Sequence, residues 1–94
     1  MKDIVNNERT LHEFLKKMIV ETLKLEDISA GDIDSDTPLF REGLGLDSLD
    51  ALELVVAIEK HFNVIIEDEN VGKQAFESIR TLATFIQAEY RQGA

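Results

Sequence analysis

An apolar stripe near the start of the chain constrains the fold more than any other feature of the sequence. We predict a helix over residues 8–24, which begins at a capping box of Thr10 and Glu13 or, one turn earlier, at Asn7. Such a stripe forms one continuous helix face and belongs in a hydrophobic core. Its members recur at i, i+3, i+4, i+7, i+8, i+11 and i+12: Leu11, Phe14, Leu15, Met18, Ile19, Thr22 and Leu23.

The rest of the chain contains two further helical patterns and almost no strand-like alternation. One runs over residues 48–61, with Asp47 as its N-cap and Asp50 three residues later in a capping-box arrangement. The other is the last helix, in which Leu82, Ala83, Ile86 and Tyr90 share a face that Ile79 precedes as a hydrophobic anchor.

Two connecting segments complete the predicted fold. Residues 67–76 have room for one short helix, which Gly72 weakens by up to ~1 kcal/mol relative to Ala. Residues 25–46 show no period, yet apolar residues recur along them and Thr37-Pro38 favours an extended or turn conformation, so we expect an ordered loop. The fold class is therefore all-α: a small helical bundle of three principal helices and one short helix, with a long ordered loop between the first and second helices.

Length and charge restrict the function classes. Ninety-four residues fit one domain, 1–94, of which residues 1–7 are expected to be a loosely ordered N-terminal extension. A radius of gyration of roughly 12 Å leaves little room for a deep catalytic cleft. The formal charge of −9 disfavours nucleic-acid binding, favours basic protein partners and, by self-repulsion, favours a monomer.

Cysteine content and hydropathy restrict the chain further. The sequence has no Cys, which excludes disulfides, thiolate zinc sites and cysteine nucleophiles. The first residues lack an apolar run of signal-peptide length, and no apolar stretch approaches the ~18 residues of a membrane span. We therefore expect no membrane insertion and a cytoplasmic location.

The predicted helix over residues 48–61 has two apolar faces where a globular helix needs one. Its core face comprises Ala51, Leu54, Val55, Ile58 and Phe62. A second stripe lies nearly opposite, flanked by acidic residues and Lys60: Leu49, Leu52 and Val56. This second stripe is the feature of the sequence that a simple core does not explain.

Other polar patterns favour ordinary structural explanations. Asp32-x-Asp34-x-Asp36 begins like a calcium loop, but Thr37 and Gly43 occupy the positions where Gly and a bidentate Glu are required, so we expect a solvated acidic turn and no metal site. His12 and His61 lack a metal-ligand spacing and are expected to be surface residues. Gly43 and Gly45 are best explained as turn formers.

Ser48 begins the predicted helix beside the second apolar stripe. A catalytic role is disfavoured because Gly-x-Ser-x-Gly is absent and His61 lies about 20 Å along the same helix, which leaves only His12 to approach through the fold. A helix N-terminus does favour a negative group by roughly 0.3–1 kcal/mol, so Ser48 could carry a phosphodiester. On physical grounds alone, a plain serine and a modified serine both remain open.

The run Asp47-Ser48-Leu49-Asp50, with the helical residues 51–62 that follow, resembles the signature of acyl carrier proteins of the stand-alone type. The loop over residues 36–40, the glycine before Leu46 and the last helix also fit, so the resemblance covers roughly residues 10–90. It implies that Ser48 is esterified by 4′-phosphopantetheine, whose thiol carries acyl groups as thioesters, and that the chain is a carrier and not an enzyme.

The resemblance also implies partners: a phosphopantetheinyl transferase, and acyl-processing enzymes of fatty-acid, polyketide or related lipid synthesis whose basic surfaces meet the acidic helix. An acyl chain could fold back between the helices against residues 66–79. Alternatives are an aminoacyl or D-alanyl carrier of the same fold and an unmodified acidic helical adaptor. The implied partner-recognition residues are Asp47, Leu49, Asp50, Glu53, Val56 and Glu59.

Overall fold

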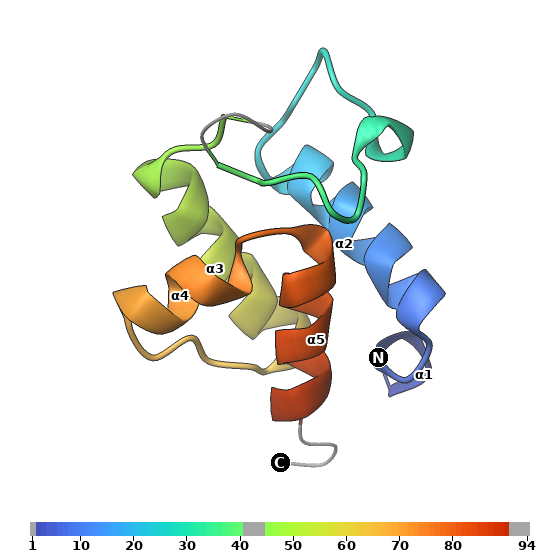
Figure 1. The fold of residues 1–94 in the computed structure, drawn as a ribbon, viewed down its shortest axis with the longest axis vertical. Helices are drawn as coiled ribbons and strands as arrows, with labels where there is room; N and C mark the ends of the chain where they lie inside the picture. Colours follow the sequence, from blue (N-terminus) through green and yellow to red (C-terminus); the bar gives the residue numbers. More distant parts are fainter. Residues whose placement is uncertain (1, 41–44, 91–94) are drawn as a thin grey trace.

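The computed structural model describes residues 2–40 and 45–90, and the regular elements in these ranges are helices (Figure 1). The described residues contain no β-strand, which confirms the all-α prediction. Their radius of gyration is 12.2 Å. The elements in chain order are α1 (Lys2–Val5), α2 (Glu8–Thr22), the 3-10 turn η1 (Ala30–Asp32), α3 (Ser48–Phe62), α4 (Glu69–Ala75) and α5 (Ile79–Glu89).

Capping residues set where the two longest helices begin and end. The Asn7 side chain accepts a hydrogen bond from the Thr10 N–H at 3.1 Å, so α2 begins at the earlier of its two predicted starts and the expected Thr10–Glu13 box is not used. Helix α3 begins with the predicted capping box of Asp47 and Asp50. It ends at Asn63, whose left-handed backbone, with φ of 56°, stops the helix.

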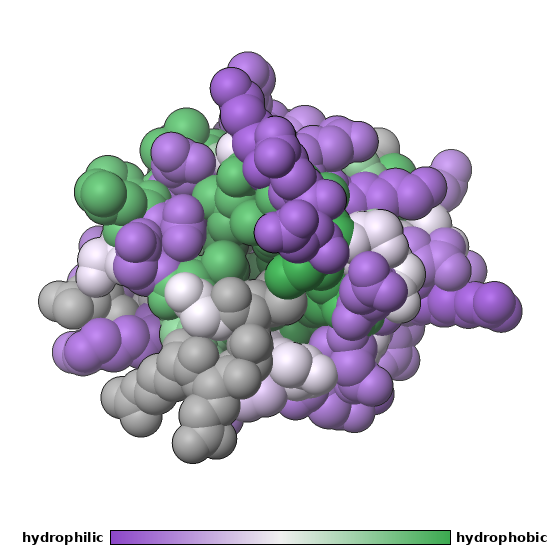
Figure 2. All heavy atoms as spheres, turned by 90° about the horizontal axis from the view of Figure 1, so that it is seen from above, coloured by the Kyte–Doolittle hydropathy of each residue, from purple (hydrophilic) through white to green (hydrophobic). Residues whose placement is uncertain are grey.

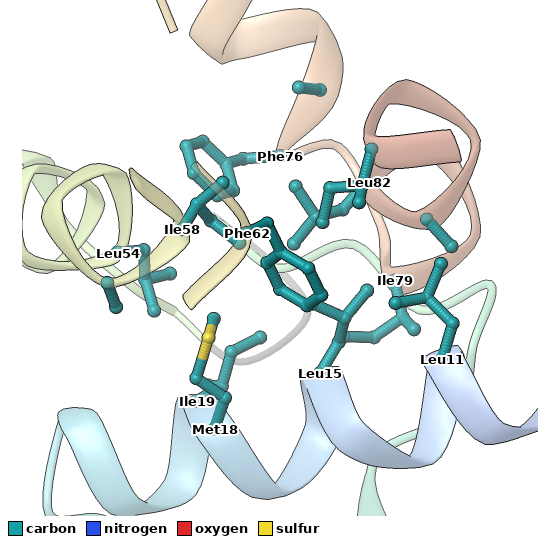
Figure 3. Close-up of a cluster of buried hydrophobic side chains, with 14 of the residues drawn as sticks. Leu11, Leu15, Met18, Ile19, Leu54, Ile58, Phe62, Phe76, Ile79 and Leu82 are labelled. Atoms are coloured by element: carbon teal, nitrogen blue, oxygen red, sulfur yellow. The ribbon is translucent and has the colours of Figure 1, made fainter. Parts of the chain in front are cut away.

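The hydrophobic core lies where α2, α3 and α5 meet, with α4 packed against α5 (Figure 1). The predicted stripe of α2 is confirmed as its buried face, since Leu11, Leu15 and Ile19 have no exposed surface. Figure 3 shows the Phe62 ring in the middle of this core, between Leu15 of α2 and Leu82 of α5. Each of these helices is therefore held by burial of its own apolar face.

The N-terminal residues differ from the expected loose extension. Residues 2–5 form helix α1, which contacts both α2 and α5. Val5 is 2% exposed, and its carbonyl accepts a hydrogen bond from the Gln87 side chain of α5 at 3.0 Å. A single turn is too short to show a helical period in the sequence, so its packing could not be predicted from the pattern.

The connection between α2 and α3 is pinned to the core, as an ordered loop should be. Ile33 and Leu39 are buried, and the Leu39 N–H donates to the Glu77 carbonyl at 3.1 Å. The Arg80 N–H at the start of α5 donates to the Ser35 carbonyl at 2.9 Å. Gly45 has a φ of 69°, as expected of a turn former, whereas Gly43 lies outside the described residues.

Candidate functional site

Ser48 is the first residue of α3 and is exposed to solvent. The Asp47 carboxylate accepts from the Asp50 N–H, and the Asp50 carboxylate accepts from the Asp47 N–H, each at 3.0 Å. Within the described residues, the N–H groups of Ser48 and Leu49 have no acceptor, as is usual in a first helical turn. The capping box thus fixes the backbone around a serine hydroxyl that is free to react with a group from outside.

The two faces of α3 are as different as the sequence predicts. Leu54 and Ile58 have no exposed surface, whereas Leu49 is 72% exposed, Leu52 61% and Val56 56%. Figure 2, which looks onto the end of the molecule where α3 begins, shows apolar side chains at the surface beside hydrophilic ones. The second stripe is therefore an apolar surface beside Ser48 and forms no part of the core.

Acidic side chains border this apolar surface. Asp47, Glu53 and Glu59 are exposed and Asp50 is partly exposed. In the part of the chain that the structure describes, none of these four carboxylates forms an ion pair. Their charge remains available to basic groups on another molecule.

Ile65, in the segment between α3 and α4, is a further exposed apolar residue that the sequence analysis did not assign to a surface. It is 62% exposed, whereas its neighbour Val64 is 2% exposed. Val64 is therefore part of the core, whereas Ile65 is not. An extended backbone points successive side chains to opposite sides, and this alternation was the signal that could have separated the two residues.

His12 corrects the prediction that both histidines lie at the surface. His61 is exposed, and its ring packs edge-on against Phe14 with the two ring centroids 5.6 Å apart. His12, in contrast, is only 8% exposed. Its Nδ1 lies 2.9 Å from the Ser35 hydroxyl oxygen, because the loop after η1 folds over this side of α2. Burial lowers the pKa of His12, an effect that the nearby Glu8 carboxylate opposes. His12 thus meets Ser35, and no hydrogen bond joins an imidazole to Ser48 within the described residues.

The acidic turn is fastened to the molecule by its own hydrogen bonds and one ion pair. Asp36 accepts from the Arg80 guanidinium, with Nη2 and Oδ2 3.2 Å apart, and this contact holds the pKa of Asp36 below its usual value. The Ser29 N–H and hydroxyl donate to Asp32, which lowers the pKa of that carboxyl. Among residues 2–40 and 45–90, no cluster of three or more His, Asp or Glu side chains suits a metal ion.

Comparison with known proteins decides which family this site belongs to. A family described as "Phosphopantetheine attachment site" matches residues 13–86. The "Acyl carrier protein" of Onion yellows phytoplasma (strain OY-M) is 42% identical over 74 residues, which cover 79% of this chain and 90% of that protein. The "Acyl carrier protein" of Phytoplasma australiense is 39% identical over 74 residues, covering 74% of this chain and 95% of that protein. The chain belongs to the acyl carrier protein family.

Membership of the acyl carrier family establishes the class of function. The protein is a carrier and not an enzyme, and its cofactor is a covalent 4′-phosphopantetheine, whose thiol supplies thioester chemistry. Its partners include a phosphopantetheinyl transferase and acyl-processing enzymes. No helix in the described part of this carrier has the length and apolar character that a membrane crossing requires.

The N-terminus of α3 fits such a cofactor. An exposed hydroxyl can be esterified without disturbing the core, and the partial positive charge of a helix N-terminus stabilises a phosphodiester there. Asp47 and Asp50 are turned onto each other's backbone N–H groups by the capping box, so their carboxylates are held in place beside the Ser48 hydroxyl.

Proposed function

We propose that Ser48 carries the phosphopantetheine arm and that acyl groups on the arm are delivered to enzymes of fatty-acid, polyketide or related lipid synthesis. The observation that supports this assignment most directly is the exposed Ser48 hydroxyl at the start of a capped helix, within the family match over residues 13–86. An aminoacyl or D-alanyl cargo would require different docking enzymes, but the same attachment residue.

We propose that α3 is also the docking helix. Exposed Leu49 and Val56 supply apolar contact area next to the arm, which is where a partner has to bind in order to reach its thiol. The carboxylates of Asp47, Asp50, Glu53 and Glu59 form no ion pair within the described residues. They would orient a basic partner and raise its association rate more than its affinity. Partners of this carrier are therefore expected to present positive charge around an apolar patch, and the same acidic surface favours a monomeric carrier.

The region where an acyl chain could fold back is filled by side chains in this structure. Ile58 and Phe62 of α3 pack near Phe76 and Ile79, and all four have at most 1% of their surface exposed (Figure 3). Burial of an acyl chain there would require α4 to move away from the core, with a gain of up to ~0.8 kcal/mol for each CH₂ buried. Helix α4 has only seven residues, fewer than α2, α3 or α5, so among these four helices it could move with least loss of packing.

The decisive experiment is the intact mass of the protein after incubation with coenzyme A and a broad-specificity phosphopantetheinyl transferase. The unmodified sequence should gain one phosphopantetheine group, and Ser48→Ala should gain none. Ser29→Ala is the matched control, because Ser29 is also exposed but lies in the loop before η1, and this variant should be loaded normally. Loading of Ser48→Ala would show that the arm is attached elsewhere and would refute the assignment.

A further inference from the structure

Ser35 has the neighbour that Ser48 lacks, a buried imidazole. Its hydroxyl oxygen lies 2.9 Å from Nδ1 of His12, and the Ser35 side chain is partly exposed. Neither residue is among those proposed above to carry the phosphopantetheine arm or to form the docking surface. His12 also lies outside residues 13–86, so the family match does not assign a role to this pair.

The charges around His12 determine which ring nitrogen holds the proton. The Nε2 atom is buried and has no hydrogen-bond partner among the described residues, but a carboxylate oxygen of Glu8 lies 3.7 Å away. A negative charge at that distance favours the proton on Nε2, which leaves the lone pair of Nδ1 to accept the Ser35 O–H. Ser35 and His12 are thus arranged as a nucleophile and a base, and the Glu8 carboxylate acts on the base through its charge.

Burial keeps the imidazole in the form that can accept a proton. The pKa of His12 is lowered, first by desolvation, then by the positive charges of Arg80 and Lys16, while Glu8 and Asp36 act in the opposite direction. His12 is therefore mostly neutral at pH 7.

An open hollow gives access to the pair. It measures about 700 Å³ and is lined by Glu8, His12 and Ser35, with Lys16 and Arg80 also on its wall. The Ser35 carbonyl accepts from the Arg80 N–H at 2.9 Å, so the backbone of the serine is fixed at the edge of the hollow. The Lys16 side chain on this wall would supply positive charge near a carbonyl oxygen that becomes negative during attack, whereas the Arg80 guanidinium is already paired with Asp36 and Glu8.

We propose that Ser35 is a second acylation site, at which the hydroxyl takes an acyl group from an activated ester or thioester with His12 as general base. The Ser35 oxygen forms a bond to the acyl carbon while its proton passes to Nδ1 of His12. The bond from the acyl carbon to the leaving thiolate or alkoxide then breaks, and the leaving group takes that proton from His12. The products are a serine ester and a free thiol or alcohol, so no further reactant is needed.

The test uses the full chain carrying Ser48→Ala, so that no arm thiol competes and the outcome does not depend on the function proposed above. After incubation with p-nitrophenyl acetate at pH 7.5, peptide mapping by mass spectrometry gives the acetylation rate of each residue. Ser29 is the internal control, since it lies in the same loop but its hydroxyl bonds to the Asp32 carboxylate instead of an imidazole. Ser35 should react on the order of 10²-fold faster than Ser29, the lower end of general-base acceleration.

Further measurements distinguish general-base catalysis by His12 from acetylation of Ser35 that results only from its exposure to solvent. The His12→Asn variant should lower the Ser35 rate to that of Ser29, and Glu8→Gln, which alters an exposed side chain, should reduce it less. The rate should rise with pH through the lowered pKa of His12 and level off above ~6.5. When acetyl-coenzyme A replaces p-nitrophenyl acetate, the same Ser35 adduct should form more slowly. Acetylation confined to lysines, or a Ser35 rate unchanged in His12→Asn and Glu8→Gln, would overturn the proposal.

Discussion

Two regions of the molecule differ in how their polar side chains are paired. One is the junction where α2, the η1 loop and α5 meet, and the other is helix α3. At the junction, Asp36 is paired with Arg80, and His12 is held against Ser35. On α3, the carboxylates of Glu53 and Glu59 form no ion pair within the described residues. The junction satisfies its charges internally and so fixes a loop, whereas α3 leaves its charges and apolar side chains for other molecules.

The same contrast runs across the single helix α3. Its buried side is held by Leu54 and Ile58, and its exposed side presents Leu49, Leu52 and Val56. Core residues act on stability, and surface apolar residues act on binding, so substitutions on the two sides of one helix should have separable effects.

The largest expected effect comes from the buried side of α3. Replacement Leu54→Ala should lower the free energy of unfolding by roughly 2–5 kcal/mol, because it removes a fully buried side chain and leaves a cavity. The matched change Leu52→Ala, two residues away on the exposed side, should change it by no more than about 0.5 kcal/mol. Urea denaturation of both variants measures this difference, and equal losses would contradict the division of α3 into a core face and a free face.

The next effect concerns docking. Val56→Asp should slow phosphopantetheine loading at low carrier concentration about tenfold, since a central apolar contact is worth roughly 1–2 kcal/mol. Its urea midpoint should remain close to that of the unchanged protein, because Val56 is 56% exposed. Loading is followed by intact mass over time, with Ile65→Asp as the comparison at an exposed apolar residue outside α3. An unchanged loading rate for Val56→Asp would remove this residue from the docking surface.

A smaller effect is expected at the capping box. Asp47→Ala removes the acceptor for the Asp50 N–H and should cost about 1 kcal/mol of stability, within the usual 0.5–2 kcal/mol for an N-cap. Asp47→Asn, whose side-chain oxygen can still accept that hydrogen bond, should recover most of the loss. The midpoint of thermal unfolding reports both changes. If Asn fails to recover stability, the charge of Asp47 matters more than the cap.

The smallest effect, and the one with the clearest pH dependence, belongs to the exposed Arg80–Asp36 pair. Because the folded pKa of Asp36 is depressed, its contribution to stability is full above the unfolded pKa of about 4 and is lost as pH falls through the folded value. Arg80→Gln should therefore be less stable than the unchanged protein at neutral pH, with the difference shrinking in acid. Urea titrations at several pH values test this, and a difference that does not depend on pH would assign the loss to packing of Arg80.

Helical periodicity and local capping chemistry were enough to predict most of the fold. The stripe from Leu11 to Leu23 placed α2, and the Asp47–Asp50 pair placed the start of α3 at its observed residue. The position of Ser48 at the start of α3 and the exposed stripe could be predicted because they depend only on residues adjacent along one helix. These are contacts over one to four residues, which sequence spacing encodes directly.

The features that the sequence did not reveal depend on contacts between distant segments. Helix α1 is stabilised where Val5 meets α5 through Gln87, 82 residues later, and no short pattern records that contact. His12 lies next to the stripe of α2 but becomes buried only because Ser35, 23 residues away, folds over it. The exposure of a residue at the edge of an amphipathic face is set by the loop that covers it, and the path of a loop without periodicity cannot be read from spacing.

The hydrogen bond between Gln87 and Val5 also affects which side of the molecule faces the solution when the chain is attached to a solid support. It holds α1 against the end of α5, so the two ends of the described chain lie together at the bottom of Figure 1, while α3 begins near the top. A sensor chip or bead linked through either end would therefore leave the Ser48 end directed into solution. Immobilised carrier should accordingly remain open to soluble enzymes from the side on which α3 begins.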